Sequence, residues 1–200
     1  MTALGTRLAE KGFGRPSGLL GRLGGRLMAR GNAATEQHMV TLADLQQEEV
    51  VLVMGPGPGI GLQAAAQCSA HVIGIDPSEV MLDGCRRRCA DAIGRGRTQL
   101  IQATAEHTGQ PDCSVDVVIA VNNVSMWSDR QAGCTELHRA LRPGGRLLVS
   151  MHQKWLPGGL NALADTVAAS GFTDVHTWTW APPGRGATTA AQLHARRAPS

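Results

Sequence analysis

Apolar and polar residues follow one another along the chain in blocks that predict strands and helices in turn. Short apolar runs rich in β-branched residues occupy positions 50–54, 71–75, 98–103, 115–121 and 146–151. The stretches between them predict helices over residues 60–68, 78–93, 130–141 and 160–170. Strands that alternate with helices indicate a parallel sheet that is covered on both faces. The predicted class is therefore α/β, with a doubly wound, mostly parallel sheet.

The two ends of the chain extend this pattern. A lid-like helix is predicted over residues 29–45, and two further strands are predicted over 173–180 and 192–197 with a hairpin-like connection. A length of 200 residues suits a single folded domain with a sizeable core. We therefore expect residues 1–45 to form a basic N-terminal arm and the lid helix, and residues 46–200 to form the ligand-binding domain.

The first predicted strand runs directly into three alternating glycines, Gly55, Gly57 and Gly59. The residues after Gly61 are mostly good helix formers. A strand, a glycine turn and a helix bring backbone N–H groups and a helix N-terminus against a nucleotide-bearing ligand. Glycine suits the turn because a β-carbon would block close approach and because positive φ costs glycine little.

An acidic residue stands at the end of the second predicted strand. Asp76 lies 21 positions after Gly55. In doubly wound folds, an acidic side chain about 20 residues past the glycine loop accepts hydrogen bonds from ribose hydroxyls. Because Pro77 and Ser78 follow, the alternative role of Asp76 is that of a helix N-cap or a turn residue. The preceding glycine loop favours the ribose role.

The glycine spacing separates two kinds of nucleotide ligand. A dinucleotide-binding fingerprint has glycines at its first, third and sixth positions, and the sixth position counted from Gly55 is Ile60. The pattern Gly55-x-Gly57-x-Gly59 instead resembles the first motif of class I S-adenosylmethionine (SAM)-dependent methyltransferases. The resemblance continues through three later segments, residues 74–82, 111–122 and 141–149. The chain is most similar to the small-molecule group related to the ubiquinone/menaquinone-biosynthesis methyltransferases.

This resemblance implies a fold, a reaction and a set of site residues. The fold is a seven-stranded, Rossmann-like sheet with a closing antiparallel strand and an N-terminal helical lid, and the reaction transfers a methyl group from SAM to a small organic acceptor. Asp76 would bind ribose, and Met81 would pack on the adenine. Ligands of open parallel sheets bind outside the carboxyl ends of the strands, which adds the loops after later strands. The predicted cofactor-binding residues are Gly55, Pro56, Gly57, Gly59, Asp76, Pro77, Met81, Ala103, Thr104, Ala105 and Asn122.

Two positions depart from the family pattern. The family usually has an acidic residue just before the first glycine, which helps to orient the methionine amino group of SAM, and this chain has Met54. After the third predicted strand the family carries an Asp that binds the adenine amino group, and this chain has Thr104. A thioether is a poor hydrogen-bond acceptor, whereas a threonine hydroxyl still accepts one hydrogen bond. The alternative function is therefore a SAM-fold binding or partner protein without turnover.

Two histidines are candidate general bases. Methyl transfer asks chiefly for alignment of donor and acceptor atoms, which is worth about 7–11 kcal/mol, but an alcohol or phenol acceptor also favours a base. His38 lies in the predicted lid, and His152 lies at the end of the fifth predicted strand. The alternative for each is a surface or rim histidine. Trp127 is a candidate to stack on a planar acceptor or to close the pocket wall, with simple packing as its alternative.

Cysteine content and hydropathy bear on the compartment. Five cysteines without a Cys-x-x-Cys pair indicate a reducing environment and give no support for a metal site. Cys85 and Cys89 share a predicted helix face, either as a pair for a thiophilic ligand or as two small buried residues. No run of 18 apolar residues and no secretory signal occur, so stable membrane insertion is not expected. We predict a cytoplasmic protein.

Charge and aromatic content bear on the partners. The net charge is +3, and the first thirty residues carry six basic side chains and one acidic side chain. That asymmetry suits an anionic partner or a membrane surface, but the glycines in this segment favour a solvated, partly disordered arm. With no Tyr and two Phe, the chain lacks an aromatic cluster for base stacking, so nucleic acid is not expected. The predicted partner is a small-molecule substrate; the acceptor, the methylated atom and the oligomeric state stay open.

Overall fold

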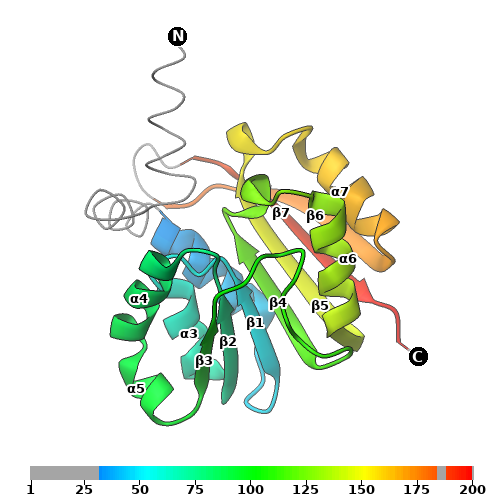
Figure 1. Ribbon diagram of the computed structural model, residues 1–200. Coiled ribbons are helices and arrows are strands. Elements are labelled where there is room, and N and C mark those ends of the chain that lie inside the picture. Colours follow the sequence, from blue (N-terminus) through cyan, green and yellow to red (C-terminus); the bar gives the residue numbers. More distant parts are fainter. Residues whose placement is uncertain (1–31, 184–187, 200) are drawn as a thin grey trace.

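The computed structural model describes residues 32–183 and 188–199 of the 200-residue chain (Figure 1). Seven strands form one sheet in the order β3-β2-β1-β4-β5-β7-β6. Strands β1 to β5 are parallel, and β7 runs antiparallel to both β5 and β6. The prediction of a doubly wound, mostly parallel sheet is confirmed. The strands are β1 Val50–Met54, β2 His71–Ile75, β3 Thr98–Ile101, β4 Val115–Val121, β5 Leu141–His152, β6 Phe172–Trp180 and β7 Ala190–Arg197.

Helices cover both faces of the sheet. Figure 1 shows α3, α4 and α5 beside the half that contains β1 to β3, and α6 and α7 beside the other half. Residues 32–43 form a further helix, as predicted for the lid, whereas the predicted arm over 1–31 lies outside the described residues. The remaining helices and 3₁₀ turns are α3 Ile60–Cys68, α4 Glu79–Arg88, α5 Ala90–Gly94, η2 Val124–Met126, α6 Arg130–Ala140, η3 Gln153–Trp155 and α7 Gly159–Ala169.

The side chains of β1 alternate between two layers of the core, one on each face of the sheet. Val51 and Val53 pack in a cluster with Met39 of the N-terminal helix and the residues of α3. Leu52 and Met54 point to the opposite face, into a cluster with residues of α6 and α7. Successive side chains of a strand point to opposite faces, so an apolar run without polar interruption is what a strand buried on both sides requires.

The order of the strands places the ligand-binding edge. β1 pairs with β2 on one side and with β4 on the other, so the chain crosses to opposite sides of β1 in its two halves. β1 and β4 are neighbours, and the loops that follow them therefore leave the sheet in opposite directions. A crevice for ligands forms at such a switch point, outside the carboxyl ends of the strands.

Several element boundaries differ from the prediction. The helix expected over 78–93 is divided at Cys89, whose φ of −101° and ψ of 19° leave the helical region. The strand expected over 98–103 ends at Ile101, because Ile101 pairs with Ile75 and β2 ends there. β5 begins at Leu141 rather than 146, because Leu141 pairs with Val115 ahead of a register shift.

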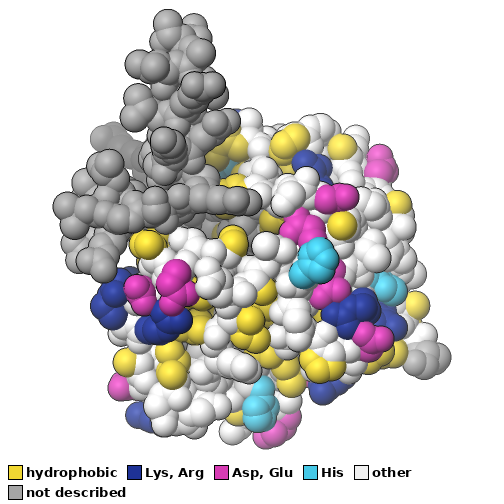
Figure 2. Space-filling model, viewed as in Figure 1, with side chains coloured by type: hydrophobic (Ala, Val, Ile, Leu, Met, Phe, Trp, Pro, Cys, Tyr) yellow, Lys and Arg dark blue, Asp and Glu magenta, His cyan; other side chains and the backbone are white. Residues whose placement is uncertain are grey.

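Basic and acidic side chains pair with one another on the surface. Figure 2 shows basic and acidic side chains side by side at two edges of this face. On α4, Arg86 contacts both Glu79 and Asp83, and on α6, Arg139 contacts Glu136 and, across the surface, Asp112. None of the helices in residues 32–183 and 188–199 combines the length and the apolar character needed to cross a membrane.

Arg146 of β5 fastens the N-terminal helix to the sheet. Its guanidinium donates to the Ala43 carbonyl oxygen at 2.6 and 2.9 Å and to the Asp44 carbonyl oxygen at 3.2 Å. It also forms a two-pronged ion pair with Glu49 at 2.6 and 2.9 Å. These carbonyls close the C-terminal end of a helix, where unpaired acceptors and a negative dipole favour a cation. One side chain thus holds the helix end and the approach to β1.

We expect Arg146→Met to lower the free energy of unfolding by about 2 kcal/mol, because the loss of the guanidinium removes the donors to the Ala43 carbonyl and breaks the ion pair with Glu49, whose carboxylate keeps only the Gln46 N–H. Urea denaturation measures this change. Arg196→Met is the matched control, since Arg196 lies exposed on β7 and makes one bond, to the Gly144 carbonyl. Equal losses in the two variants would contradict the assigned role of Arg146.

Candidate active site

The glycine loop closes over the end of β1 with all three glycines at positive φ. The φ values of Gly55, Gly57 and Gly59 are 53°, 53° and 91°. A β-carbon on Gly55 would lie 2.8 Å from Nδ2 of Asn123, and one on Gly59 would lie 3.2 Å from Sγ of Cys85. Among residues 32–183 and 188–199, nothing lies within 4 Å of a β-carbon on Gly57. Protein atoms thus crowd the first and third glycines, while the described residues leave the second glycine open.

Asp76 lies at the end of β2 beside this loop. It is buried, and its Oδ1 accepts a hydrogen bond from the Ser78 N–H at 2.9 Å. Burial raises the pKa of Asp76 to about 6, against the lowering effect of the Ser78 and Gly57 N–H groups. Asp76 therefore stabilises the turn at Ser78, as the alternative role predicted. Its contact with the Gly57 N–H also joins it to the glycine loop. Of the two neighbours proposed with it, Pro77 is exposed and Met81 is buried in α4.

Two consecutive asparagines follow β4 and have different tasks. Asn122, at a φ of 56°, accepts a hydrogen bond from the His152 N–H at 2.9 Å, while its Nδ2 is buried with no partner among the described residues. Asn123 donates from Nδ2 to the Met54 carbonyl oxygen at 2.6 Å and accepts from the Trp127 indole N–H at 3.2 Å. This contact of Asn123 could not be predicted from the sequence, because its partner is on a strand 69 residues earlier.

The structure places the two candidate bases in different surroundings. His152 ends β5, with Nε2 3.2 Å from Oδ1 of Asn32 and with Nδ1 buried and unpartnered among the described residues. Burial lowers the pKa of His152, and nearby Lys154 lowers it further. His38 instead stacks on Trp180 of β6, with ring centroids 4.0 Å apart and planes 4° apart. His152 therefore lies at the site edge as a neutral imidazole, whereas His38 has a packing partner on the neighbouring β6.

The loop after β3 is held by its own polar contacts. Ala105 is buried, and Ala103 packs on the core cluster beneath α6. Thr104 bonds to the carboxylate of Glu106, which also accepts the Asp129 N–H at 3.0 Å. The loop is thereby tied to the start of α6. Trp127 packs against Gly133 of α6, as its packing alternative proposed.

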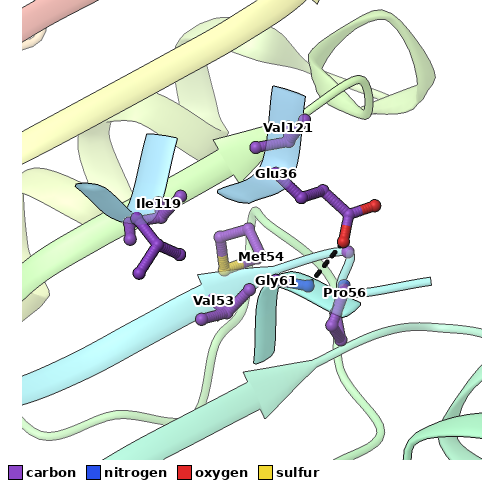
Figure 3. Close-up of a pocket in the computed structure, with 9 residues that line it drawn as sticks. Glu36, Val53, Met54, Pro56, Gly61, Ile119 and Val121 are labelled. Atoms are coloured by element: carbon purple, nitrogen blue, oxygen red, sulfur yellow. Dashed lines mark hydrogen bonds between the residues drawn. The ribbon is translucent and has the colours of Figure 1, made fainter. Parts of the chain in front are cut away.

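A carboxylate that the sequence analysis missed reaches the glycine loop from the N-terminal helix. Oε2 of Glu36 accepts the Gly61 N–H at 2.6 Å, near the start of α3, as Figure 3 shows. Glu36 also lines a pocket with an empty volume of about 280 Å³, part of it open to solvent. The available signal was an acidic residue among the apolar positions of the predicted lid helix.

Met54 lies between the core and the pocket at the end of β1. Its side chain packs in the core cluster of α6 and α7, and Met54 also lines the pocket that Glu36 lines. Val53 lines the same pocket and packs in the core cluster of the N-terminal helix and α3. Because side chains alternate along a strand, the side chains of Val53 and Met54 point to opposite faces of the sheet.

The two buried cysteines of α4 and its continuation give no indication of a metal site. Cys85 and Cys89 are buried against the sheet, and burial raises the pKa of both thiols. Among the described residues, no group of three or more histidine, cysteine or acidic side chains is placed to hold a metal ion.

We expect Gly55→Ala to lower the free energy of unfolding by about 3 kcal/mol and Gly57→Ala by about 1 kcal/mol, because both substitutions incur positive-φ strain but only the first also displaces Asn123 from its hydrogen bond. Urea denaturation of the two variants measures the difference. Equal losses would show that the Asn123 contact contributes nothing.

Comparisons with known proteins agree with this geometry. Residues 52–149 match the model of a family described as a methyltransferase domain. The chain is 31% identical over 163 residues to the uncharacterized methyltransferase YdaC of Bacillus subtilis, a match that covers 76% of this chain and 87% of YdaC. It is 35% identical over 101 residues to a demethylmenaquinone methyltransferase of Clavibacter sepedonicus, covering 50% of this chain and 40% of that protein.

Among solved structures, a SAM-dependent methyltransferase from Aquifex aeolicus superposes with a TM-score of 0.70 at 15% identity, covering 84% of this chain and 93% of that one. This likeness concerns the fold, and the relationship to YdaC concerns the family. The chain therefore belongs to the class I SAM-dependent methyltransferases, enzymes that use S-adenosylmethionine as the methyl donor.

Proposed function

We propose that the protein transfers the methyl group of SAM to a small organic acceptor at the carboxyl ends of β4 and β5. The observation that carries this proposal is the open side of the glycine loop at Gly57, next to the buried carboxylate of Asp76. The loop, the acid and the unpartnered amide of Asn122 belong to neighbouring strand ends, at the switch point of the sheet.

The residues at these strand ends fit the parts of SAM. The open backbone at Gly57 suits close approach, the carboxylate of Asp76 suits two ribose hydroxyls, and Met81 supplies apolar surface for the adenine. SAM supplies a methyl group on a sulfonium, which a nucleophile displaces in line. Donor contacts are proposed for Gly55, Pro56, Gly57, Gly59, Asp76, Pro77, Met81, Ala103, Thr104, Ala105 and Asn122.

The acceptor side is marked by exposed apolar groups on two 3₁₀ turns. Met126 of η2 is 45% exposed and Trp155 of η3 is 57% exposed, and these turns follow β4 and β5 directly. Lys154 places its ammonium 4.4 Å from the Trp155 ring centre. An aromatic ring, a thioether and one cation suit a small, partly apolar acceptor with an acidic hydroxyl. One of the relatives is, by its name, a demethylmenaquinone methyltransferase.

His152 is the proposed general base for such an acceptor. Nδ1 is buried and Nε2 lies 3.2 Å from Oδ1 of Asn32, so the ring has to release the Asn32 contact before an acceptor can reach a basic nitrogen. The lowered pKa of His152 keeps the ring neutral near pH 7, and a neutral ring is the form that can take a proton. The backbone bond from His152 to Asn122 fixes this histidine relative to the end of β4.

A nucleic-acid acceptor has less support. Arg86, the first of three consecutive arginines on α4, is already paired with Glu79 and Asp83. A side chain held by two carboxylates is a poor partner for phosphate. The absence of nucleic-acid binding and the cytoplasmic location stay predictions.

Titration calorimetry with SAM and S-adenosylhomocysteine (SAH) tests the donor site. We expect binding to the wild type, a loss of about tenfold or more in Asp76→Ala, and weakening of wild-type binding as the pH falls below about 6, where Asp76 gains a proton and loses acceptor capacity. Asp76→Asn should bind weakly and should lose the part of the pH dependence that is centred near pH 6. Thermal unfolding confirms that each variant is folded. Wild-type affinity that stays flat through pH 6 would remove Asp76 from the ribose role.

Incubation with SAM and a panel of quinols, phenols and thiols tests the acceptor, with mass spectrometry to detect the added methyl group. We expect His152→Gln to lower the rate with a phenolic acceptor by about 100-fold, because a positioned base contributes of that order, and to leave SAH binding unchanged. His38→Gln is the matched comparison, expected to keep the wild-type rate. A rate loss in His38→Gln alone would move the base to the N-terminal helix.

A further inference from the structure

Glu36 is a buried carboxylate at the glycine loop with little to hold its charge. It is 9% exposed, and the Gly61 N–H is its hydrogen-bond partner within the described residues. The pocket wall around it is largely apolar, formed in part by Val40, Val53 and Ile119. Burial raises the pKa of Glu36 to about 7, and the Gly61 N–H and the charge of Arg88 offset only part of that rise.

Helix capping explains one of the two carboxylate oxygens. α3 begins after Gly59, which offers no side-chain cap, and its first turn has no acidic residue. A carboxylate at a helix N-terminus is favourable, so Oε2 of Glu36 serves Gly61. A neutral amide oxygen would accept the same bond without the cost of burying a charge. The cap therefore accounts for Oε2 and leaves Oε1 without a hydrogen-bond partner among the described residues.

The place of Glu36 supplies a reason for the charge. The side chain comes from helix 32–43 and lies beside Val53, Gly55 and Pro56 at the end of β1. This is the edge at which the proposed donor site begins. β1 itself offers no acid there, since the β1 residues that line this pocket are Val53 and Met54.

We propose that Glu36 binds the α-ammonium group of the methionine moiety of SAM. This inference rests on the proposed donor site and names the residue that recognises its amino-acid end. The ammonium would compensate a carboxylate that has one hydrogen bond among the described residues, and this contact would join the N-terminal helix to the bound donor. Glu36 thereby distinguishes a donor that carries an amino acid from an adenosine thioether that lacks one.

Calorimetry with two ligands separates this role from capping. SAH carries the ammonium, and 5′-methylthioadenosine has the adenosine and the thioether without the amino acid. We expect Glu36→Gln, which keeps an oxygen for Gly61, to weaken SAH binding about tenfold or more and to change 5′-methylthioadenosine binding by less than about twofold. Glu79→Gln, an exposed position on α4, is the matched control and should bind both ligands as the wild type does.

A pH series on the wild type gives a second measurement that needs no variant. Asp76 titrates in the same range, but it serves the adenosine part that both ligands share. The preference for SAH over 5′-methylthioadenosine should therefore fall as the pH is lowered from about 8 to about 5.5, as Glu36 gains a proton. The charged and titratable groups that act on Glu36 are Arg88 and Cys85; the pKa of Cys85 is raised by burial, so that thiol stays neutral throughout.

The outcomes are distinct. Selective loss of SAH affinity in Glu36→Gln, or a preference that follows pH, supports the proposal. Equal weakening of both ligands would reduce Glu36 to a cap, and an unchanged ratio across the pH series would also overturn the ammonium contact. If SAH and 5′-methylthioadenosine both fail to bind the wild type, the donor site itself is wrong. If both bind and the variant does not discriminate, the donor site stands and only the role of Glu36 falls.

Discussion

The site depends on one short hydrogen bond between the ends of two parallel strands. Asn123 donates to the carbonyl oxygen of Met54 at 2.6 Å and leaves so little room that residue 55 must lack a β-carbon. This contact holds β1 and β4 together at the point where their loops part, and it fixes the direction in which the glycine turn leaves the sheet. The same side chain receives the Trp127 indole, so the packing over α6 is tied to the loop.

Two buried acidic side chains characterise the site. Asp76 and Glu36 are both buried carboxyl groups whose pKa values burial raises, one at the end of β2 and one on the N-terminal helix. Among the described residues, backbone N–H groups of the glycine turn and of α3 stabilise these carboxylates, and Arg88 adds to that effect at Glu36. Two half-compensated buried acids are costly for an empty protein and well suited to a ligand that carries hydroxyl donors at one end and positive charge at the other.

Local sequence determined much of this picture. The unbroken apolar run before Gly55 predicts a strand buried on both faces, and the distance to Asp76 follows from one helix and one strand between them, so both could be predicted. The tasks of Glu36 and Asn123 could not, because each depends on a partner 25 or 69 residues away. The part that Met54 plays could not be predicted from the sequence either, because Met54 both packs in the core and lines the pocket.

Residues of β5 contact both ends of helix 32–43. Arg146 binds the carbonyls at residues 43 and 44, and six positions later His152 meets Asn32 at the opposite end. Eleven helical steps of about 1.5 Å and six strand steps of about 3.3 Å give similar spans, so the helix length is matched to the strand. Adding one residue between positions 37 and 42 would turn Glu36 by about 100° around the axis relative to the Arg146 anchor. Natural variants of this protein should therefore vary in length before or after this helix but not within it.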